Sequence, residues 1–184
     1  MSTPAGSPPI VAVVGLKDSG KTSVAVALVA ELRRRKKRVM VVKHGHRFDL
    51  DHEGTDSWRF REEGGVERVV LAGPSNFAVM GEWGPGDELS LAELVARFLP
   101  DADIVVAEGY KSEPVPKIEV HRPEAHPEPL YRRGTEDAAH YIAIVTDALE
   151  LEADVPVLDI NSTDLTTELA DLVERRVLGS FPAD

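Results

Sequence analysis

Residues 15–22 read Gly-Leu-Lys-Asp-Ser-Gly-Lys-Thr, a glycine, four further residues and then Gly-Lys-Thr. This is the spacing of a phosphate-binding loop, in which glycines permit a tight turn with exposed backbone N–H groups. The apolar run at 10–14 and the helical pattern after residue 20 supply the strand and helix that the motif requires. Because backbone N–H groups and a helix dipole both favour a bound anion, the stretch predicts a nucleotide site.

Two side chains of this loop carry the expected chemistry. Lys21 is placed to reach the β- and γ-phosphates, and the hydroxyl of Thr22 is placed to ligate Mg²⁺. The side chain of Lys17 is expected either to neutralise phosphate charge or to face solvent. The predicted nucleotide-binding residues of the loop and the start of its helix are Gly15, Lys17, Asp18, Ser19, Gly20, Lys21, Thr22 and Ser23.

Length and composition limit the classes of protein to consider. The 184 residues suffice for one domain, expected at 10–179 between flexible tails at 1–9 and 180–184. A formal net charge of −11 argues against a nucleic-acid binder. The absence of cysteine excludes disulfides and thiolate metal sites. No apolar run is long enough to span a bilayer and the N-terminus lacks the features of a secretory signal, so a cytoplasmic location without membrane binding is expected.

The order of the periodic segments predicts the fold. Apolar strand patterns alternate with amphipathic helix patterns, which is typical of a parallel sheet between helices. We therefore expect a single three-layer α/β/α domain of the phosphate-loop class, mainly parallel, with an antiparallel hairpin at 66–81. Strands are expected at 10–14, 38–43, 103–109, 117–121, 141–145 and 156–160, and helices at 21–37, 56–63, 90–99 and 165–177.

Local patterns add four expectations. The apolar strand at 38–43 is expected to be covered on both faces of the sheet. The alternation at 117–121 predicts a strand with one exposed face. The basic run at 33–38 is expected to be a solvated helix end, in preference to a docking patch. Trp83 is expected to fill a core rather than to anchor an interface.

An acid at the end of a buried strand marks a second part of the nucleotide site. Glu108 follows the apolar run 104–107, and phosphate-loop proteins place such an acid near Mg²⁺, directly or through water. Glu108 and Thr22 are therefore the predicted metal ligands, and Lys21 and Glu108 the predicted catalytic residues. Asp147, which follows the strand at 141–145, is a candidate for accepting hydrogen bonds from a guanine base, or else a turn residue.

The segment 43–57 contains three histidines and four acids without periodicity. One interpretation is a nucleotide- or partner-responsive loop in which Asp49, Asp51 or Asp56 helps to hold Mg²⁺ or the γ-phosphate. A second is a transition-metal site built from His44, His46 and His52, since imidazole is a common ligand. A plain polar surface loop is the third. The spacing does not choose among them.

Taken together, four blocks of sequence resemble the MobB family of molybdopterin-guanine dinucleotide biosynthesis adapter proteins. They are the phosphate loop 15–22, Val-Lys-His-Gly-His at 42–46, Gly-Thr-Asp-Ser at 54–57, and Glu-Gly-Tyr-Lys at 108–111 with Lys-Ile at 117–118. The sequence Asp-Ile-Asn at 159–161 also fits. One departure is Arg47, where family members often carry a further histidine.

This resemblance implies a GTP-binding homodimer with weak GTPase activity that uses Mg²⁺. Its implied role is to assist the guanylyltransferase that joins GMP to molybdopterin, and molybdopterin itself is a further candidate ligand. Around the terminal phosphate or the pterin phosphate, or on a partner-facing loop, the expected residues are Lys43, His44, His46, Asp56 and Lys111.

Two enzyme classes and a purely structural scaffold compete with this interpretation. A small-molecule kinase would use the same loop and Mg²⁺, although no arginine-rich lid is evident apart from Arg122, Arg132 and Arg133. A metal-insertion GTPase would use the histidines of segment 43–57. The loop alone does not discriminate between these functions, because phosphate loops serve many chemistries.

Overall fold

The computed structural model describes residues 6–45, 48, 51–84 and 86–179, and it divides into two compact units. The first unit comprises residues 1–44 and 91–184, and the second comprises residues 45–90. Each unit is described separately. None of the helices in the described ranges is both long and apolar enough to cross a membrane.

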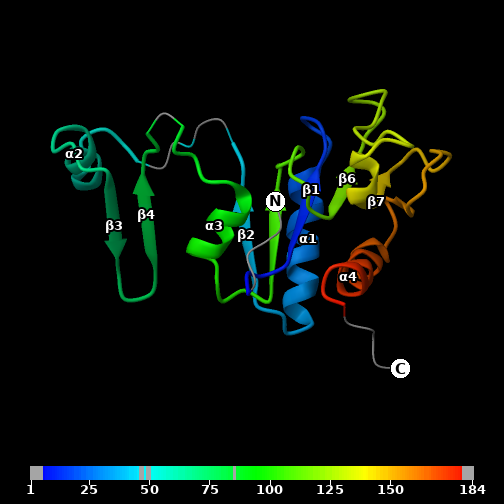
Figure 1. The fold of residues 1–184 in the computed structure, drawn as a ribbon, viewed down its shortest axis with the longest axis horizontal. Coiled ribbons are helices and arrows are strands. Elements are labelled where there is room, and N and C mark those ends of the chain that lie inside the picture. Colours follow the sequence, from blue (N-terminus) through cyan, green and yellow to red (C-terminus); the bar gives the residue numbers. More distant parts are fainter. Residues whose placement is uncertain (1–5, 46–47, 49–50, 85, 180–184) are drawn as a thin grey trace. The chain divides into compact units, whose positions relative to one another are not determined.

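A six-stranded parallel sheet forms the centre of the first unit (Figure 1). Its strand order is β2-β5-β1-β6-β7-β8, so the strand before the phosphate loop lies in the middle. All five residues of β1 are buried. The strands are β1 (Ile10–Val14), β2 (Val39–Lys43), β5 (Ile104–Glu108), β6 (Lys117–Val120), β7 (Tyr141–Thr146) and β8 (Val157–Asp159).

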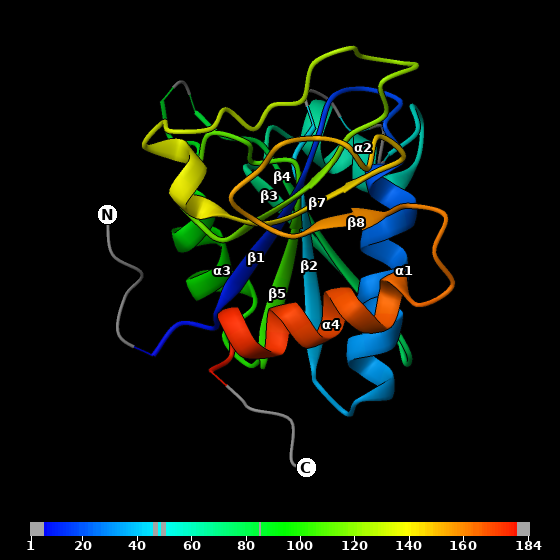
Figure 2. The same ribbon diagram turned by 90° about the vertical axis from the view of Figure 1, so that its right-hand side faces the viewer.

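Helices cover both faces of this sheet, as Figure 2 shows. α1 (Lys21–Arg34) and α4 (Leu165–Arg176) pack on one face, where Val11 and Val13 of β1 contribute to the core. α3 (Leu91–Phe98) packs on the other face, with Ala12 and Val14. Because successive side chains of a strand point to opposite faces of the sheet, β1 contributes to two separate cores. This confirms the predicted three-layer, mainly parallel α/β class.

Two strands of the sheet differ from expectation. β2 was expected to be covered on both faces, but it lies at the edge of the sheet and Val41 is half exposed. β6 was expected to have one exposed face, but all four of its residues are buried. The reason is that β6 is an interior strand, and the segment 121–140 covers its polar side through contacts described below. That segment contains the short 3₁₀ helix η1 (Asp137–His140).

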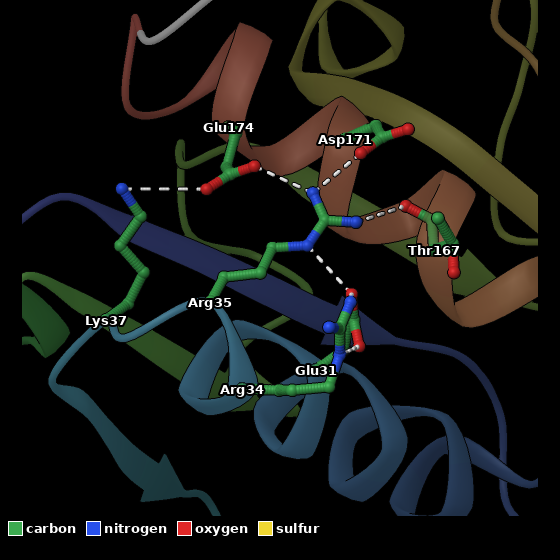
Figure 3. Close-up of polar contacts among 7 residues, drawn as sticks. All are labelled: Glu31, Arg34, Arg35, Lys37, Thr167, Asp171 and Glu174. Carbon is green, nitrogen blue, oxygen red and sulfur yellow. Dashed lines mark hydrogen bonds and ion pairs between the residues drawn. The ribbon is translucent and has the colours of Figure 1, made fainter. Parts of the chain in front are cut away.

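The basic run at the end of α1 forms a clamp between helices instead of a solvated end (Figure 3). Arg35 donates to Glu31 of its own helix at 2.8 Å, and to Asp171 and Glu174 of α4 at 2.6 and 2.7 Å. Lys37 lies 3.5 Å from Glu174. The Arg34 and Arg35 hydrogen bonds lower the pKa of Glu31 to about 2. Both sequence interpretations of this run therefore missed its main role, which is to join α1 to α4.

The second unit contains a helix and a hairpin, both near the expected positions. α2 (Asp56–Glu62) begins where Thr55 accepts a hydrogen bond from the backbone N–H of Trp58 at 3.3 Å, which caps the helix. β3 (Arg68–Ala72) and β4 (Phe77–Gly81) pair antiparallel, which confirms the hairpin. Their register puts Val70, Phe77 and Val79 on one face, and all three are exposed in the single chain. Trp83 is also exposed, contrary to the expectation of a core position.

Candidate functional site

The predicted phosphate loop, residues 15–22, runs from the carboxyl end of the central strand β1 into α1. Gly15 has φ 150°, and a Cβ there would lie far inside van der Waals contact with the carbonyl oxygen of Val120. Only glycine therefore allows the backbone of the loop to pass so close to β6. Gly20, just before α1, has φ 89°, a conformation that glycine adopts without strain. Each glycine of the motif therefore has its own reason: Gly15 allows the close approach to β6, and Gly20 allows the positive φ.

Two polar side chains of the loop, Lys21 and Ser19, are candidates for contact with a bound anion. Lys21 donates from Nζ to the carbonyl oxygen of Leu16 at 2.5 Å. Burial lowers the pKa of Lys21, while the neighbouring carboxylates of Glu108 and Asp18 act in the opposite direction. Ser19 is buried, and its Oγ has no hydrogen-bond partner within the described part of the chain. A buried hydroxyl without a partner is costly, so a ligand oxygen at this loop would relieve it.

Glu108 joins three elements at the carboxyl edge of the sheet. Its Oε1 accepts a hydrogen bond from Thr22 Oγ1 at 2.9 Å and lies 3.0 Å from Lys43 Nζ. Thr22 comes from α1, Glu108 from β5 and Lys43 from β2. The structure therefore brings together the two predicted metal ligands. A Mg²⁺ ion at this hydroxyl and carboxylate would take the place of the Lys43 ammonium.

The loops after β2 and β5 lie side by side. The backbone N–H of His44 donates to the carbonyl oxygen of Glu108 at 3.0 Å, and the rings of His44 and Tyr110 have centroids 5.2 Å apart. Gly109 has φ 95°, and a Cβ at that position would lie 3.2 Å from the Cβ of His44. The sequence Glu-Gly-Tyr at the end of β5 therefore shapes the backbone against which His44 packs.

Several predicted residues are not brought into this cluster by the described contacts. His46 and Asp49 lie outside the described residues. Asp56 begins α2 in the second unit, where Asp51 accepts hydrogen bonds from Thr55 and Ser57. Those bonds, the one from Thr55 first, lower the pKa of Asp51. Across the described ranges, no three potential ligands gather as a metal site would require.

A hollow of about 460 Å³ lies beside the phosphate loop. Its lining consists of Asp18, Ser19 and Gly20 together with Arg122, Glu124 and Ala125. Arg122 Nε lies 3.0 Å from Asp147 Oδ2, so the predicted base-reading carboxylate already holds a guanidinium. Of the other predicted loop residues, Lys17 and Ser23 are exposed.

Sequence reasoning missed the histidines that attach segment 121–126 to the loop. His126 Nε2 lies 2.7 Å from the carbonyl oxygen of Lys17, so this nitrogen carries the proton and donates. The buried His121 donates from Nε2 to the carbonyl oxygen of His126 at 2.9 Å. A loop histidine carries no local signal of such a contact, because its partner lies more than a hundred residues away in sequence.

Lys111 lines a different hollow, of about 350 Å³, with Ser112, Leu130, Asp137 and Tyr141. It was expected with Lys43 around a terminal phosphate or a pterin phosphate, or on a partner-facing loop. No described contact joins Lys111 to Thr22, Lys43 or Glu108.

Comparison with known proteins decides the family. Residues 10–147 match the family described as MobB, molybdopterin guanine dinucleotide synthesis protein B. The chain belongs to the MobB family. It is 38% identical over 168 residues to the molybdopterin-guanine dinucleotide biosynthesis adapter protein of Haemophilus influenzae, covering 90% of this chain and 88% of that protein. The resemblance inferred from the four sequence blocks is thus confirmed.

Solved MobB structures share the fold. Bacillus subtilis MobB has a TM-score of 0.65 at 19% identity, over 89% of this chain and 97% of that one. A MobB homolog from Bacillus stearothermophilus has a TM-score of 0.65 at 22% identity, over 91% of this chain and 99% of that one. At these identities the likeness bears on the fold alone.

Proposed function

We propose that this chain binds GTP with Mg²⁺ and acts as an adapter for the guanylyltransferase that joins GMP to molybdopterin. The observation that carries the nucleotide part is the 2.9 Å hydrogen bond between Thr22 and Glu108 next to Lys21. A loop hydroxyl and a strand-end carboxylate in contact are the two protein groups that phosphate-loop proteins use around Mg²⁺. The adapter part rests on membership of the MobB family and on the relative from Haemophilus influenzae.

In this proposal each residue at the edge of the sheet has a role. Backbone N–H groups of the phosphate loop and Lys21 bind the β- and γ-phosphates. Thr22 and Glu108 would hold Mg²⁺, while Lys43 would leave Glu108 and face the terminal phosphate. Because these groups stabilise charge but supply no dedicated base, hydrolysis is weak.

The guanine preference is assigned to Asp147. Its carboxylate would accept from the N1 and N2 donors of guanine, and Arg122 would move from Asp147 into the hollow beside the loop. That hollow of about 460 Å³ is within the size range of small-molecule sites.

A homodimer is part of the proposal. The hairpin face of Val70, Phe77 and Val79 supports it, since Phe77 is 79% exposed and Val70 63% exposed in the single chain. Contiguous exposed apolar side chains mark interaction surfaces. Sedimentation of the purified chain tests this state, and a monomer at micromolar concentration would contradict it. A cytoplasmic location stays a prediction.

Titration of the wild type and of Lys21→Ala with GTP and ATP in the presence of Mg²⁺ tests the nucleotide site. Loss of a charge-assisted contact of about 1.5–3 kcal/mol should weaken GTP binding by about tenfold to a hundredfold. Lys37→Ala, which removes a lysine on the α1–α4 clamp, is the matched control and should bind like the wild type. A wild type without specific nucleotide binding would remove the proposal.

The adapter role is tested by co-purification with the guanylyltransferase and by the yield of guanine dinucleotide with and without this chain. A chain that fails to bind the enzyme would overturn the adapter role while leaving the nucleotide site intact. Brisk turnover that depends on a phosphoryl acceptor would instead favour a kinase.

A further inference from the structure

On one face of the interior strand β6, two charged side chains point into the protein. Lys117 is 0% exposed and Glu119 is 1% exposed, and they lie two residues apart on the side of the sheet that also carries α3. Burying a charge costs free energy unless it is paired, so each of the two side chains needs an explanation.

Glu119 is explained by structure alone. Its carboxylate accepts from the backbone N–H groups of Leu130 and Tyr131 at 2.5 and 2.8 Å. These contacts fasten segment 121–140 over the sheet. Burial raises the pKa of Glu119, and the two backbone hydrogen bonds act against that rise.

Lys117 has a partner of a different kind. Its Nζ lies 2.5 Å from Asp137 Oδ1 and 5.4 Å from the centre of the Tyr141 ring. The pair is asymmetric, because the lysine is fixed in an interior strand while the Asp137 side chain is 52% exposed. Asp137 belongs to η1, a four-residue 3₁₀ helix, a type of helix whose hydrogen-bond geometry is poorer than that of an α-helix.

A hollow lies beside Asp137, the exposed member of this pair, and Lys117 itself does not line it. It measures about 350 Å³ and is lined by Lys111 and Ser112 after β5, and by Leu130, Asp137 and Tyr141. The lining offers a second ammonium, two hydroxyl groups and an apolar surface. If Asp137 moved aside, the ammonium of Lys117 would become the floor of this hollow.

We propose that the hollow over Lys117 is an anion site, separate from the phosphate loop, which binds a phosphate monoester that carries a ring. Asp137 occupies the position of the anion when the site is empty, and the phosphate displaces it. The ammonium groups of Lys111 and Lys117 and the hydroxyl of Ser112 donate to the phosphate oxygens, because a phosphate offers more charge and more acceptors than a carboxylate. The ring packs on Leu130 and Tyr141, which a volume near 350 Å³ accommodates.

Calorimetry in the Lys21→Ala background tests this site, since that variant has lost the phosphate contact of the loop. Phenyl phosphate should bind one to one and more tightly than inorganic phosphate. Lys117→Met should weaken phenyl phosphate binding by about tenfold to a hundredfold, the usual value of a charge-assisted contact. Asp137→Asn should strengthen it, because the competing carboxylate charge is removed. Lys37→Met, which removes a lysine from the clamp, is the control and should change nothing.

Unchanged binding in Lys117→Met, or binding that is no tighter in Asp137→Asn, would overturn the proposal. The second variant replaces an exposed side chain, so it stays informative even if Lys117→Met does not fold. Guanosine monophosphate serves as the third probe. If phenyl phosphate competes with guanosine monophosphate and Lys117→Met affects the binding of neither, phenyl phosphate lies in the nucleotide site and the proposal fails. The wild-type response to GTP plays no part in these outcomes.

Discussion

The two faces of β6 are equally buried and chemically opposite. Ile118 and Val120 pack into the core shared with α1 and α4, whereas Lys117 and Glu119 lie on the other side among polar contacts. The first face gains stability from removal of apolar surface from water. The second face must offset a desolvation cost with hydrogen bonds and ion pairs. The comparison shows that complete burial of a strand does not by itself indicate an apolar core.

The largest effect is expected from the apolar face. Ile118→Ala should lower the free energy of unfolding by about 2–5 kcal/mol, because it removes buried methyl groups and leaves a cavity. Urea denaturation of the wild type and the variant measures the difference. Lys117→Met is the matched change on the polar face and should cost much less, since Asp137 remains half exposed and hydrated. An equal decrease in the free energy of unfolding in the two variants would contradict the difference between the two faces of β6.

A smaller effect is expected at Glu119. Glu119→Ala leaves the N–H groups of Leu130 and Tyr131 without their acceptor and should cost about 1–3 kcal/mol. Glu119→Gln retains one acceptor oxygen and should cost less. Hydrogen exchange of the amides of Leu130 and Tyr131 gives the local readout. Unaltered protection of both amides in Glu119→Ala would contradict the role assigned to this carboxylate.

The smallest effect is expected in the pH dependence of stability that arises from Glu31 and Glu119. The pKa values of these two carboxylates shift in opposite directions. The pKa of Glu31 in the clamp falls to about 2, so its stabilisation is present above the ordinary pKa of 4.5 and is lost as the pH falls toward 2. Burial raises the pKa of Glu119, so its effect has the opposite sign. The folded state then holds the proton more tightly, and stability falls as the pH rises from 4.5 through the raised pKa.

Urea midpoints between pH 2.5 and 7 for the wild type, Glu31→Gln and Glu119→Gln isolate the two contributions by difference. The Glu31→Gln difference should shrink toward acid pH. The stability of the wild type should fall as the pH rises through the raised pKa of Glu119. The Glu119→Gln variant should not show this fall. Parallel curves for all three proteins would refute both assignments.

Much of the fold was predictable because its signals are local. The motif at 15–22, the strand before it and the helix after it lie where the pattern predicts, and so do α3, β5 and the hairpin of β3 and β4. The contact of Thr22 with Glu108 also followed, since parallel strands end at the same edge of a sheet.

Other features depended on partners distant in sequence. The alternation in β6 predicted an exposed face because a period of two reports amphipathicity and not what covers the polar side. The basic run at 33–38 gave no sign that Arg35 contacts Asp171 and Glu174 on α4.

By itself, the sequence determined the glycine-containing loop between β1 and α1, the parallel α/β class and the family, because each depends on the order and spacing of residue types. Only the tertiary structure decided that Lys43 pairs with Glu108, that Arg122 pairs with Asp147, and that the buried Lys117 pairs with Asp137. These contacts join segments from 20 to 65 residues apart. Chain folding sets such distances, since short-range periodicity specifies which face a side chain occupies but not which group it meets there.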